Sequence, residues 1–301
     1  MSETLVVVVG PTGAGKSDLA VRLARALDGE VLSADSMQVY RGFDIGTAKV
    51  TPEEQEGVPH HLLDVAEPDE PFSAARFVEL ADRAIDEIHR RGRRVIVAGG
   101  TGLYVRALLR GLVEAPPAAP DIRARHARVR DEQGLPALHA ALQRVDPEAA
   151  ARINENDFVR ISRALEVHEQ LGRPISTLQA EHRFATERHP SVRLGISPER
   201  GALRRRIERR VDLMMAAGWL DEVRRLVAAG HGETAPMGAL GYRHLRAHVQ
   251  GTLDLDEAVR QTKRDTWRFA RRQLNWFGAD PGIRWFDDGT QVDAGRVAQR
   301  L

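Results

Sequence analysis

The stretch "VVVVGPTGAGKSDLA", from Val6 to Ala20, decides the fold. It begins as a continuous apolar, β-branched run, which is typical of a strand buried on both faces of a parallel sheet. Gly10 to Ser17 fits the pattern G-x-x-x-x-G-K-[ST], and Leu19, Leu23 and Leu27 then recur at helical spacing. A strand, a glycine-rich loop and a helix in this order predict a loop that holds phosphate groups.

The chemistry of this loop follows from its residue types. Its glycines let backbone N–H groups curl around an anion, and the positive end of the following helix faces the same anion. Lys16 adds a point charge, and Ser17 can hold a Mg²⁺ ion that bridges phosphate oxygens. The predicted phosphate-binding residues are Gly10, Pro11, Thr12, Gly13, Ala14, Gly15, Lys16 and Ser17, with Ser17 as the metal ligand. Kinases, ATPases, GTPases and some transferases share such a loop.

Composition narrows the class of protein. The chain has 301 residues, of which 42% are hydrophobic, enough for one large or two modest domains. It contains no cysteine, which excludes disulfides, thiolate metal sites and cysteine nucleophiles. No leader peptide and no apolar run of membrane-spanning length is present, so we expect a cytoplasmic protein.

Basic charge gathers in two segments although the formal net charge is only +1. These segments are "RRRIERR", Arg204 to Arg210, and "KRDTWRFARR", Lys263 to Arg272. Local basic faces suit polyphosphate or nucleic acid. The alternative is helix-surface charge balanced by nearby acids.

Strand and helix patterns alternate in the rest of the N-terminal part. "EVLSAD" ends at Asp35 and "RRVIVAGG" ends at Gly100, and between them Ser73 is a suitable N-cap for an amphipathic helix. This alternation predicts an α/β fold, a mainly parallel sheet flanked by helices.

A proline-rich junction, Pro116 to Pro120, separates this part from a long run with helical periodicity. "VRLGIS", Val192 to Ser197, then returns as a strand, and "IRWFDD" is a possible last edge strand. We therefore predict a catalytic core over 1–117 and 191–301, with an all-helical insertion domain over 118–190.

The surroundings of the loop argue against nucleotide hydrolysis. The strand that ends at Gly100 leads to Thr101, without the acid that usually holds the metal and orients water. No Asn-Lys-x-Asp guanine-recognition motif occurs. Because ligands of open α/β sheets bind at the carboxyl ends of the strands, Asp35, Thr101 and the loop should share one crevice. Asp35 could be a general base, a Mg²⁺ ligand or a helix cap.

Several motifs in order resemble one enzyme family. They are "GPTGAGKS", "SADSMQVYRGFDIGTAK", "PHHLLD", "GGTGLYVRALL", "NDFVRISRALEV", "LGYR" and "ARRQLNWF". Over most of its length the chain resembles the tRNA dimethylallyltransferases, also called tRNA isopentenyltransferases.

The resemblance implies transfer of a dimethylallyl group from dimethylallyl diphosphate to N6 of the adenosine 3′ of the anticodon, position 37. The tRNAs would be those that read codons beginning with U, and the loop would hold the donor's diphosphate. The implied catalytic residues are Asp35, as general base, with Thr101, Lys16 and Arg206; Arg210 is a weaker candidate. Mg²⁺ would assist the leaving group.

The resemblance also implies tRNA-binding residues and a monomer whose helical insertion grips the anticodon stem-loop. These residues are Asp35, Ser36, Met37, Gln38, Thr101, Arg123, Val159, Arg160, Ile161, Ser162, Arg163 and Arg243. The chain departs from the family at Trp267, which stands where an arginine is common. His60 and His61 are read as structural rather than as a zinc site, because adjacent positions suit one metal poorly.

Three alternatives stay open. An adenylate isopentenyltransferase would perform the same chemistry on a free nucleotide, but it has less need of a helical insertion. A small-molecule kinase would use the same loop for ATP. A non-catalytic RNA-binding protein would keep the basic segments without needing Asp35.

Overall fold

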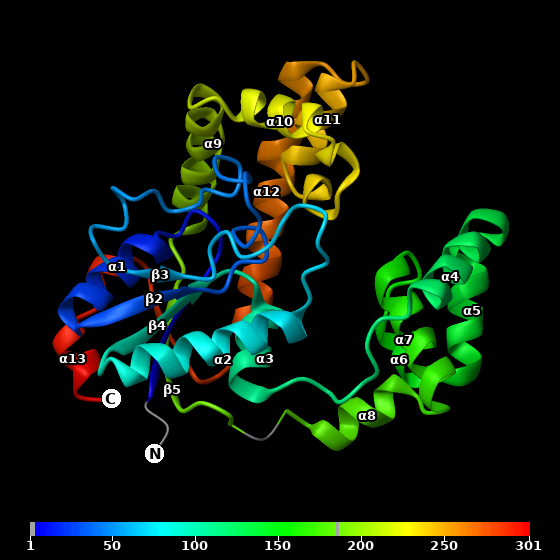
Figure 1. The fold of residues 1–301 in the computed structure, drawn as a ribbon, viewed down its shortest axis with the longest axis horizontal. Helices are drawn as coiled ribbons and strands as arrows, with labels where there is room; N and C mark the ends of the chain where they lie inside the picture. Colours follow the sequence, from blue (N-terminus) through cyan, green and yellow to red (C-terminus); the bar gives the residue numbers. More distant parts are fainter. Residues whose placement is uncertain (1–3, 185–186) are drawn as a thin grey trace. The chain divides into compact units, whose positions relative to one another are not determined.

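A computed structural model describes residues 4–184 and 187–301 of the chain. Within these residues, six parallel strands form one sheet in the order β3-β2-β4-β1-β5-β6. The strands are β1 (Leu5–Val9), β2 (Gly29–Ser33), β3 (His60–His61), β4 (Arg94–Gly99), β5 (Ser191–Ile196) and β6 (Ile283–Phe286). The α/β class predicted from the sequence is confirmed (Figure 1).

Helices follow the strands as the periodicity predicts. They are α1 (Lys16–Ala26), α2 (Ala74–Arg90), α3 (Gly102–Arg110), α9 (Arg200–Ala216), α10 (Trp219–Ala228), α11 (Tyr242–Val249), α12 (Leu255–Gly278) and α13 (Ala294–Ala298), with 3₁₀ turns η1 (His231–Glu233), η2 (Ala235–Gly238) and η3 (Gly289–Gln291). Ser73 caps α2 as expected, since its Oγ accepts the Arg76 N–H at 3.1 Å. β2 ends at Ser33, two residues before the predicted end, so Asp35 lies in the turn that follows the strand.

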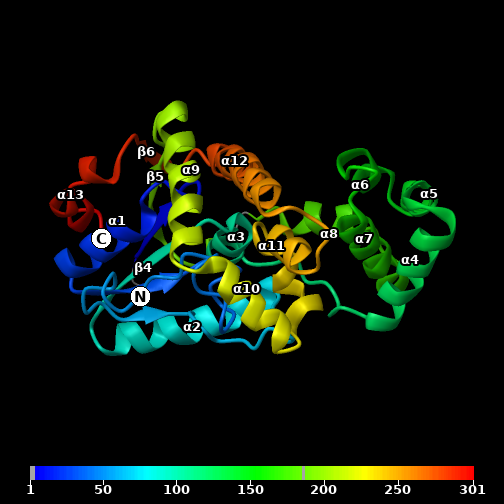
Figure 2. The same ribbon diagram turned by 90° about the horizontal axis from the view of Figure 1, so that it is seen from above.

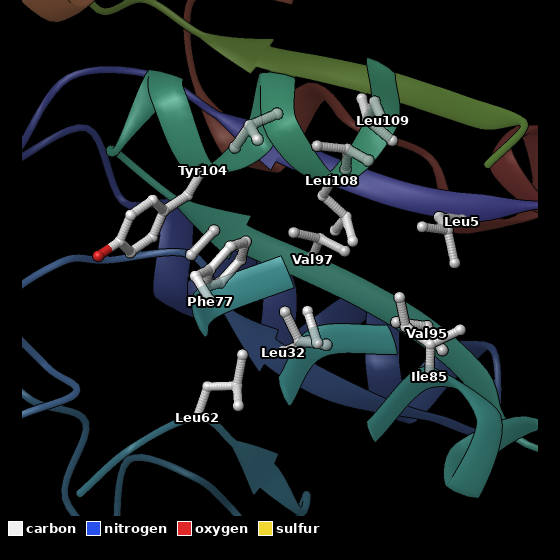
Figure 3. Packing of buried hydrophobic residues seen from close by; sticks show 14 of the residues in the cluster. Leu5, Leu32, Leu62, Phe77, Ile85, Val95, Val97, Tyr104, Leu108 and Leu109 are labelled. Carbon is white, nitrogen blue, oxygen red and sulfur yellow. The ribbon is translucent and has the colours of Figure 1, made fainter. Parts of the chain in front are cut away.

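The two faces of β1 pack against different helices. Leu5, Val7 and Val9 pack with residues of α2 and α3 (Figure 3), whereas Val6 and Val8 pack with residues of α1 and α13. Figure 2 shows α1 and α2 on opposite sides of the strands. On the α2 side, the rings of Phe77 and Tyr104 stack with centroids 4.3 Å apart. Burial of every β1 side chain on both faces explains the unbroken apolar run in the sequence.

The chain divides into two compact units, Met1–Leu109 with Arg188–Leu301, and Arg110–Glu187. The second unit contains α4 (Pro120–Gln133), α5 (Leu135–Val145), α6 (Pro147–Arg152), α7 (Phe158–Leu171) and α8 (Ile175–His182). The proline-rich junction is bonded within this unit, because Pro116 O accepts from Arg163 at 2.7 Å and Pro117 O from Gln170 at 3.4 Å. These bonds show that the junction belongs to the helical unit. The unit therefore covers Arg110–Glu187, whereas the sequence predicted an insertion over 118–190.

A buried carboxylate organises the region where α10 and α11 meet the turn over residues 43–48. Glu222 Oε2 accepts the N–H groups of Asp44 and Ile45 at 3.1 and 2.7 Å, and Oε1 accepts the Gly46 N–H at 3.3 Å. The hydroxyl of Tyr242 donates to the same Oε1 at 2.6 Å. Burial beside this carboxylate raises the pKa of Tyr242, so the phenol stays a donor.

Glu222→Ala should lower the free energy of unfolding by about 3 kcal/mol, because it leaves buried N–H groups and a hydroxyl without an acceptor. Glu222→Gln should cost about 2 kcal/mol, because the amide oxygen still accepts at one side while the amide NH₂ faces an N–H donor at the other. Urea unfolding measures both. Glu233→Ala is the matched control: its side chain is 82% exposed and pairs with Arg246, so its effect should stay below about 0.5 kcal/mol. Equal losses in the alanine variant and the control would contradict this role for Glu222.

Candidate active site

The phosphate loop runs from the end of β1 to the first turn of α1. Gly10, Gly13 and Gly15 have φ values of 145°, 79° and 87°, which L side chains rarely adopt. A Cβ on Gly10 would overlap the carbonyl of Ile196, whereas Gly15 has nothing near it. Gly15 caps α1 without a side-chain bond, so the first N–H groups of the helix are available to an anion.

A cavity of about 870 Å³ opens beside the loop. Its walls bring together the segments that sequence reasoning expected to converge: the loop, Asp35 to Gln38 and Thr101. The volume is in the range of small-molecule sites. Apolar side chains form another part of the wall: Met37, Ile207, Val211, Met214, Trp219, Leu240 and Phe269. The cavity thus offers an anion-binding end and an apolar wall.

Asp35 and Thr101 are held next to each other by backbone bonds. Asp35 Oδ1 accepts the Met37 N–H at 2.8 Å, and Oδ2 has no hydrogen bond among the described residues. Thr101 N donates to Ala34 O at 3.2 Å, and its Oγ1 accepts the Ser36 N–H at 2.9 Å. One oxygen of the carboxylate is therefore fixed by the fold, while the other can take a proton from a ligand.

Gln38 belongs to the wall rather than to a free surface. Its Oε1 accepts the Ser33 hydroxyl at 3.0 Å, and its Nε2 donates to Ala48 O at 3.1 Å and to Thr47 O at 3.5 Å. These bonds attach the strand end that carries Asp35 to the turn that Glu222 organises. The expected tRNA contact of Gln38 stays a prediction.

Two cations lie inside the cavity wall. Lys16 Nζ donates to Pro11 O at 2.8 Å. Burial first, and then the Arg210 guanidinium, lower the pKa of Lys16 to about 8, with Asp35 acting in the opposite direction. Burial also lowers the pKa of Arg210, whose guanidinium has no hydrogen bond or ion pair to any residue that the structure describes. Arg210 is only partly exposed, and the carboxylates that act on its charge, Asp35 first, lie beyond ion-pair distance. A partly desolvated cation of this kind is favoured by a ligand that supplies the opposite charge.

Arg206, which the sequence reasoning placed ahead of Arg210, lines the same cavity nearer to solvent. Its side chain is 46% exposed and pairs with Asp288 at 3.3 Å. Arg243 also lines the cavity and bonds to Asp265 at 2.8 Å. Both cations therefore have an acidic partner, in contrast to Arg210.

Ser17 fits the expected Mg²⁺ ligand. It is exposed in the first turn of α1 and lines the cavity together with Asp35. Mg²⁺ typically takes one or two protein oxygens and completes its shell with substrate phosphates and water, so a hydroxyl beside the anion site is sufficient. Among the described residues, no group of three or more His, Cys, Asp or Glu side chains is arranged to hold a metal ion by itself.

In the helical unit, the predicted tRNA-binding residues fall into two groups. Arg123 and Arg163 both bond to the buried carboxylate of Glu166, at 3.1 and 2.6 Å. Ile161 and Ser162 are buried, and Ser162 Oγ bonds to His126 Nδ1 at 2.9 Å. Val159 and Arg160 face solvent, and the Val159 side chain is 74% exposed. These last two residues are the most exposed of the set, and Arg160 pairs only at the surface, with Asp157 at 3.5 Å among the described residues.

The remaining motifs have structural partners. His60 Nδ1 bonds to Val58 O at 2.9 Å, and His61 Nε2 bonds to the buried Glu30 at 2.6 Å. Both histidines form the short strand β3, which the sequence reasoning did not anticipate. Trp267 lies on α12 and packs in a cluster with Leu203 and Ile207 of α9, and the Arg200 guanidinium lies 5.7 Å from its ring centroid. Trp267 therefore provides apolar packing at the position where an arginine is common in the family that the sequence resembles.

Two residues that line the site, Trp219 and Gln273, and one that supports its wall, Glu222, were not found from the sequence. Glu222, Trp219 and Gln273 are polar or aromatic residues inside helical patterns, where a surface or core position is the ordinary expectation. Gln273 bonds to the phosphate loop, and Trp219 packs on Gly46 and Gly241. The "ARRQLNWF" motif was the available signal for Gln273.

Comparison with known proteins agrees with this geometry. The family profile described as IPP transferase matches residues 38–280. The chain is 54% identical to tRNA dimethylallyltransferase 1 of Pelobacter propionicus, across 94% of this chain and 92% of that protein. It is 50% identical to tRNA dimethylallyltransferase 2 of Syntrophus aciditrophicus, across 99% and 96%.

Solved structures give the same result. The tRNA isopentenylpyrophosphate transferase of Bacillus halodurans aligns with a TM-score of 0.71 and 42% identity, over 99% of this chain and 94% of that one. A eukaryotic dimethylallyltransferase acting on tRNA aligns with a TM-score of 0.81 and 27% identity, over 99% and 78%. No helix in the described part of the chain is long and apolar enough to cross a membrane. With half of its residues identical to these relatives over nearly its full length, the chain belongs to the IPP transferase family of tRNA dimethylallyltransferases.

Proposed function

We propose that this protein transfers a dimethylallyl group from dimethylallyl diphosphate to N6 of adenosine 37 in tRNAs that read codons beginning with U. The products are N6-(dimethylallyl)adenosine and diphosphate. The observation that carries the proposal is one cavity with three parts: a phosphate loop, an apolar wall and the Asp35 carboxylate. These parts match the diphosphate, the five-carbon group and the nucleophile of the reaction.

The leaving group is stabilised at the loop. As the bond between C1 and the diphosphate oxygen breaks, its electron pair goes to the diphosphate, whose negative charge grows. Loop N–H groups, Lys16 and Arg210 are preorganised for that charge. Mg²⁺ held by Ser17 would add charge neutralisation at the phosphate oxygens. Below a pH of about 8 Lys16 is largely protonated, as this role requires.

The nucleophile is activated at the other side of the cavity. The N6 lone pair of adenine forms the new bond to C1, and the amine loses a proton to Asp35. The free Oδ2 of Asp35 suits this transfer, and Thr101 holds the adjoining segment through Ser36. No step needs an activated water, which agrees with the turn Gly100–Thr101 that follows β4 in place of an acid.

The RNA substrate would present an unpaired base. Bases of the anticodon loop can be splayed out of their stack, and an enzyme that modifies a base must bring it into a pocket. The exposed Val159 and Arg160 on α7 are the side chains of the helical unit that we expect to contact the stem-loop.

The decisive experiment supplies purified protein with dimethylallyl diphosphate and either an anticodon stem-loop or AMP. Nucleoside mass spectrometry then identifies the product. We expect prenylated adenosine at position 37 of the stem-loop and negligible transfer to AMP. Transfer to AMP at a comparable rate would favour the adenylate transferase, and competitive inhibition by ATP at donor-like concentrations would favour a nucleotide site.

Asp35→Asn should reduce turnover about 10²–10⁴-fold, the usual contribution of a general base. Because the amide oxygen can still accept from Met37, the stem-loop affinity should stay within about threefold. Single-turnover transfer and filter binding measure the two quantities. Asp69→Asn, at an exposed carboxylate, is the control. Turnover of the Asp35 variant within threefold of wild type would exclude Asp35 as the base.

Arg210→Ala should lower kcat/KM for the donor about 10²–10³-fold, because it removes a partly desolvated cation of the cavity wall that makes no ion pair with any described residue. Arg206→Ala should lower it less than about tenfold, since this arginine is half-exposed and bonded to Asp288. Initial rates at varied donor concentration measure both variants. A larger loss of kcat/KM in Arg206→Ala than in Arg210→Ala would show that Arg206 has the main role in stabilising the diphosphate.

A further inference from the structure

Gln273 joins two loops of the site that are far apart in the sequence. It lies on α12 and is buried, with 7% of its surface exposed. Its Oε1 accepts the Thr12 N–H of the phosphate loop at 2.9 Å. Its Nε2 donates to Gly100 O, in the turn after β4, also at 2.9 Å. One carboxamide therefore uses both an acceptor and a donor to join the ends of β1 and β4.

The second of these loops leads directly to the proposed base. Thr101 follows Gly100, and its Oγ1 accepts the N–H of Ser36, the neighbour of Asp35. Thr101 N donates to Ala34 O on the other side of Asp35. Hydrogen bonds thus connect Thr12 to Gln273 and Gln273 to Gly100, and the next residue along the chain, Thr101, bonds to the segment that carries Asp35.

The surroundings leave little freedom to this bridge. A Cβ on Gly100 would overlap Gln273 Nε2, so the backbone of the turn lies directly against the carboxamide. The bridge also occupies the Thr12 N–H, which is then unavailable to a phosphate. The anion is left to the loop N–H groups nearer α1, to Lys16 and to Arg210.

We propose that Gln273 is a positioning residue that sets the distance between the leaving-group site and the general base. The proposal rests on the proposed function of the cavity. In prenyl transfer, C1 of the donor must lie between the diphosphate held by the loop and N6 of the adenine beside Asp35. A misplacement of about 1 Å between such groups can cost about 10²-fold in rate while leaving each ligand bound.

The first test compares Gln273→Ala with wild type at saturating donor and stem-loop. We expect kcat to fall about 30- to 100-fold, with KM for both substrates and Kd for inorganic diphosphate within about threefold. Gln261→Ala is the matched control, because Gln261 lies on the same helix and, among the described residues, its side chain bonds to Glu257 of α12 and to no loop of the site. Equal losses of diphosphate affinity and kcat would overturn the proposal, since Gln273 would then be part of the anion site.

The second test uses the hydrogen-bond pattern itself. A protonated glutamic acid has one acceptor and one O–H donor, as the carboxamide has, whereas an ionised glutamate only accepts. In Gln273→Glu the turnover relative to wild type should therefore rise at least fivefold as the pH falls from about 8 to about 5.5. The ratio cancels the pH dependence that both proteins share, including that of Lys16. A turnover ratio that does not change with pH and equals the ratio for Gln273→Ala would contradict the proposed role of the Gln273 hydrogen bonds.

A third measurement separates this proposal from the proposed function. Amide hydrogen exchange at Thr12 needs no substrate, and we expect it to be at least tenfold faster in Gln273→Ala than in wild type and in Gln261→Ala. Unchanged exchange at Thr12 would overturn the bridge whatever the reaction is. Wild-type protein that transfers no dimethylallyl group to the stem-loop would instead refute the proposed function, with the exchange result still deciding the bridge.

Discussion

The position of β1 inside the sheet is the constraint on which the site depends. β1 is bonded to β4 on one side and to β5 on the other, with Val9 opposite Gly99 and Gly195. The chain must therefore leave β1 at the carboxyl end of the sheet, directly beside the turn that follows β4. There Gly10 packs against the carbonyl of Ile196, so only a glycine lets the phosphate loop begin at this point.

Charge pairing then decides which cations can serve a ligand. Two of the arginines that line the cavity have a carboxylate partner: Arg206 pairs with Asp288 and Arg243 with Asp265. Among the described residues Arg210 has none, and burial depresses its pKa and that of Lys16. In the proposed reaction, the unfavourable desolvation of these two cations in the free protein would be offset by the charge of the bound diphosphate. The same desolvation would strengthen each interaction with the leaving group in the transition state.

Patterns within short stretches of the sequence predicted the features that depend on neighbouring residues. Unbroken β-branched residues marked β1, a serine marked the start of α2, and strand ends placed Asp35 and Thr101 in one crevice. The residues that complete the site are fixed by distant partners: Gln273 lies 261 positions from Thr12, and Glu222 lies 178 from Asp44. No helical periodicity distinguishes such a residue from a surface glutamine or glutamate. The resemblance of the "ARRQLNWF" motif to the family identifies the segment that contains Gln273, but it does not show which hydrogen bonds this residue makes.

These distant partners come from the part of the chain that follows the helical insertion. The chain leaves the first unit at Leu109 and re-enters it at Arg188, whose N–H donates to Leu109 O at 2.9 Å and whose guanidinium bonds to Asp82 at 2.7 Å. Exit and return are therefore fixed together on the sheet. An insertion between them leaves the phosphate loop bonded to α12, which carries Gln273. A helical unit can thus be added for RNA recognition while the distances at the reacting atoms are set within the α/β unit alone.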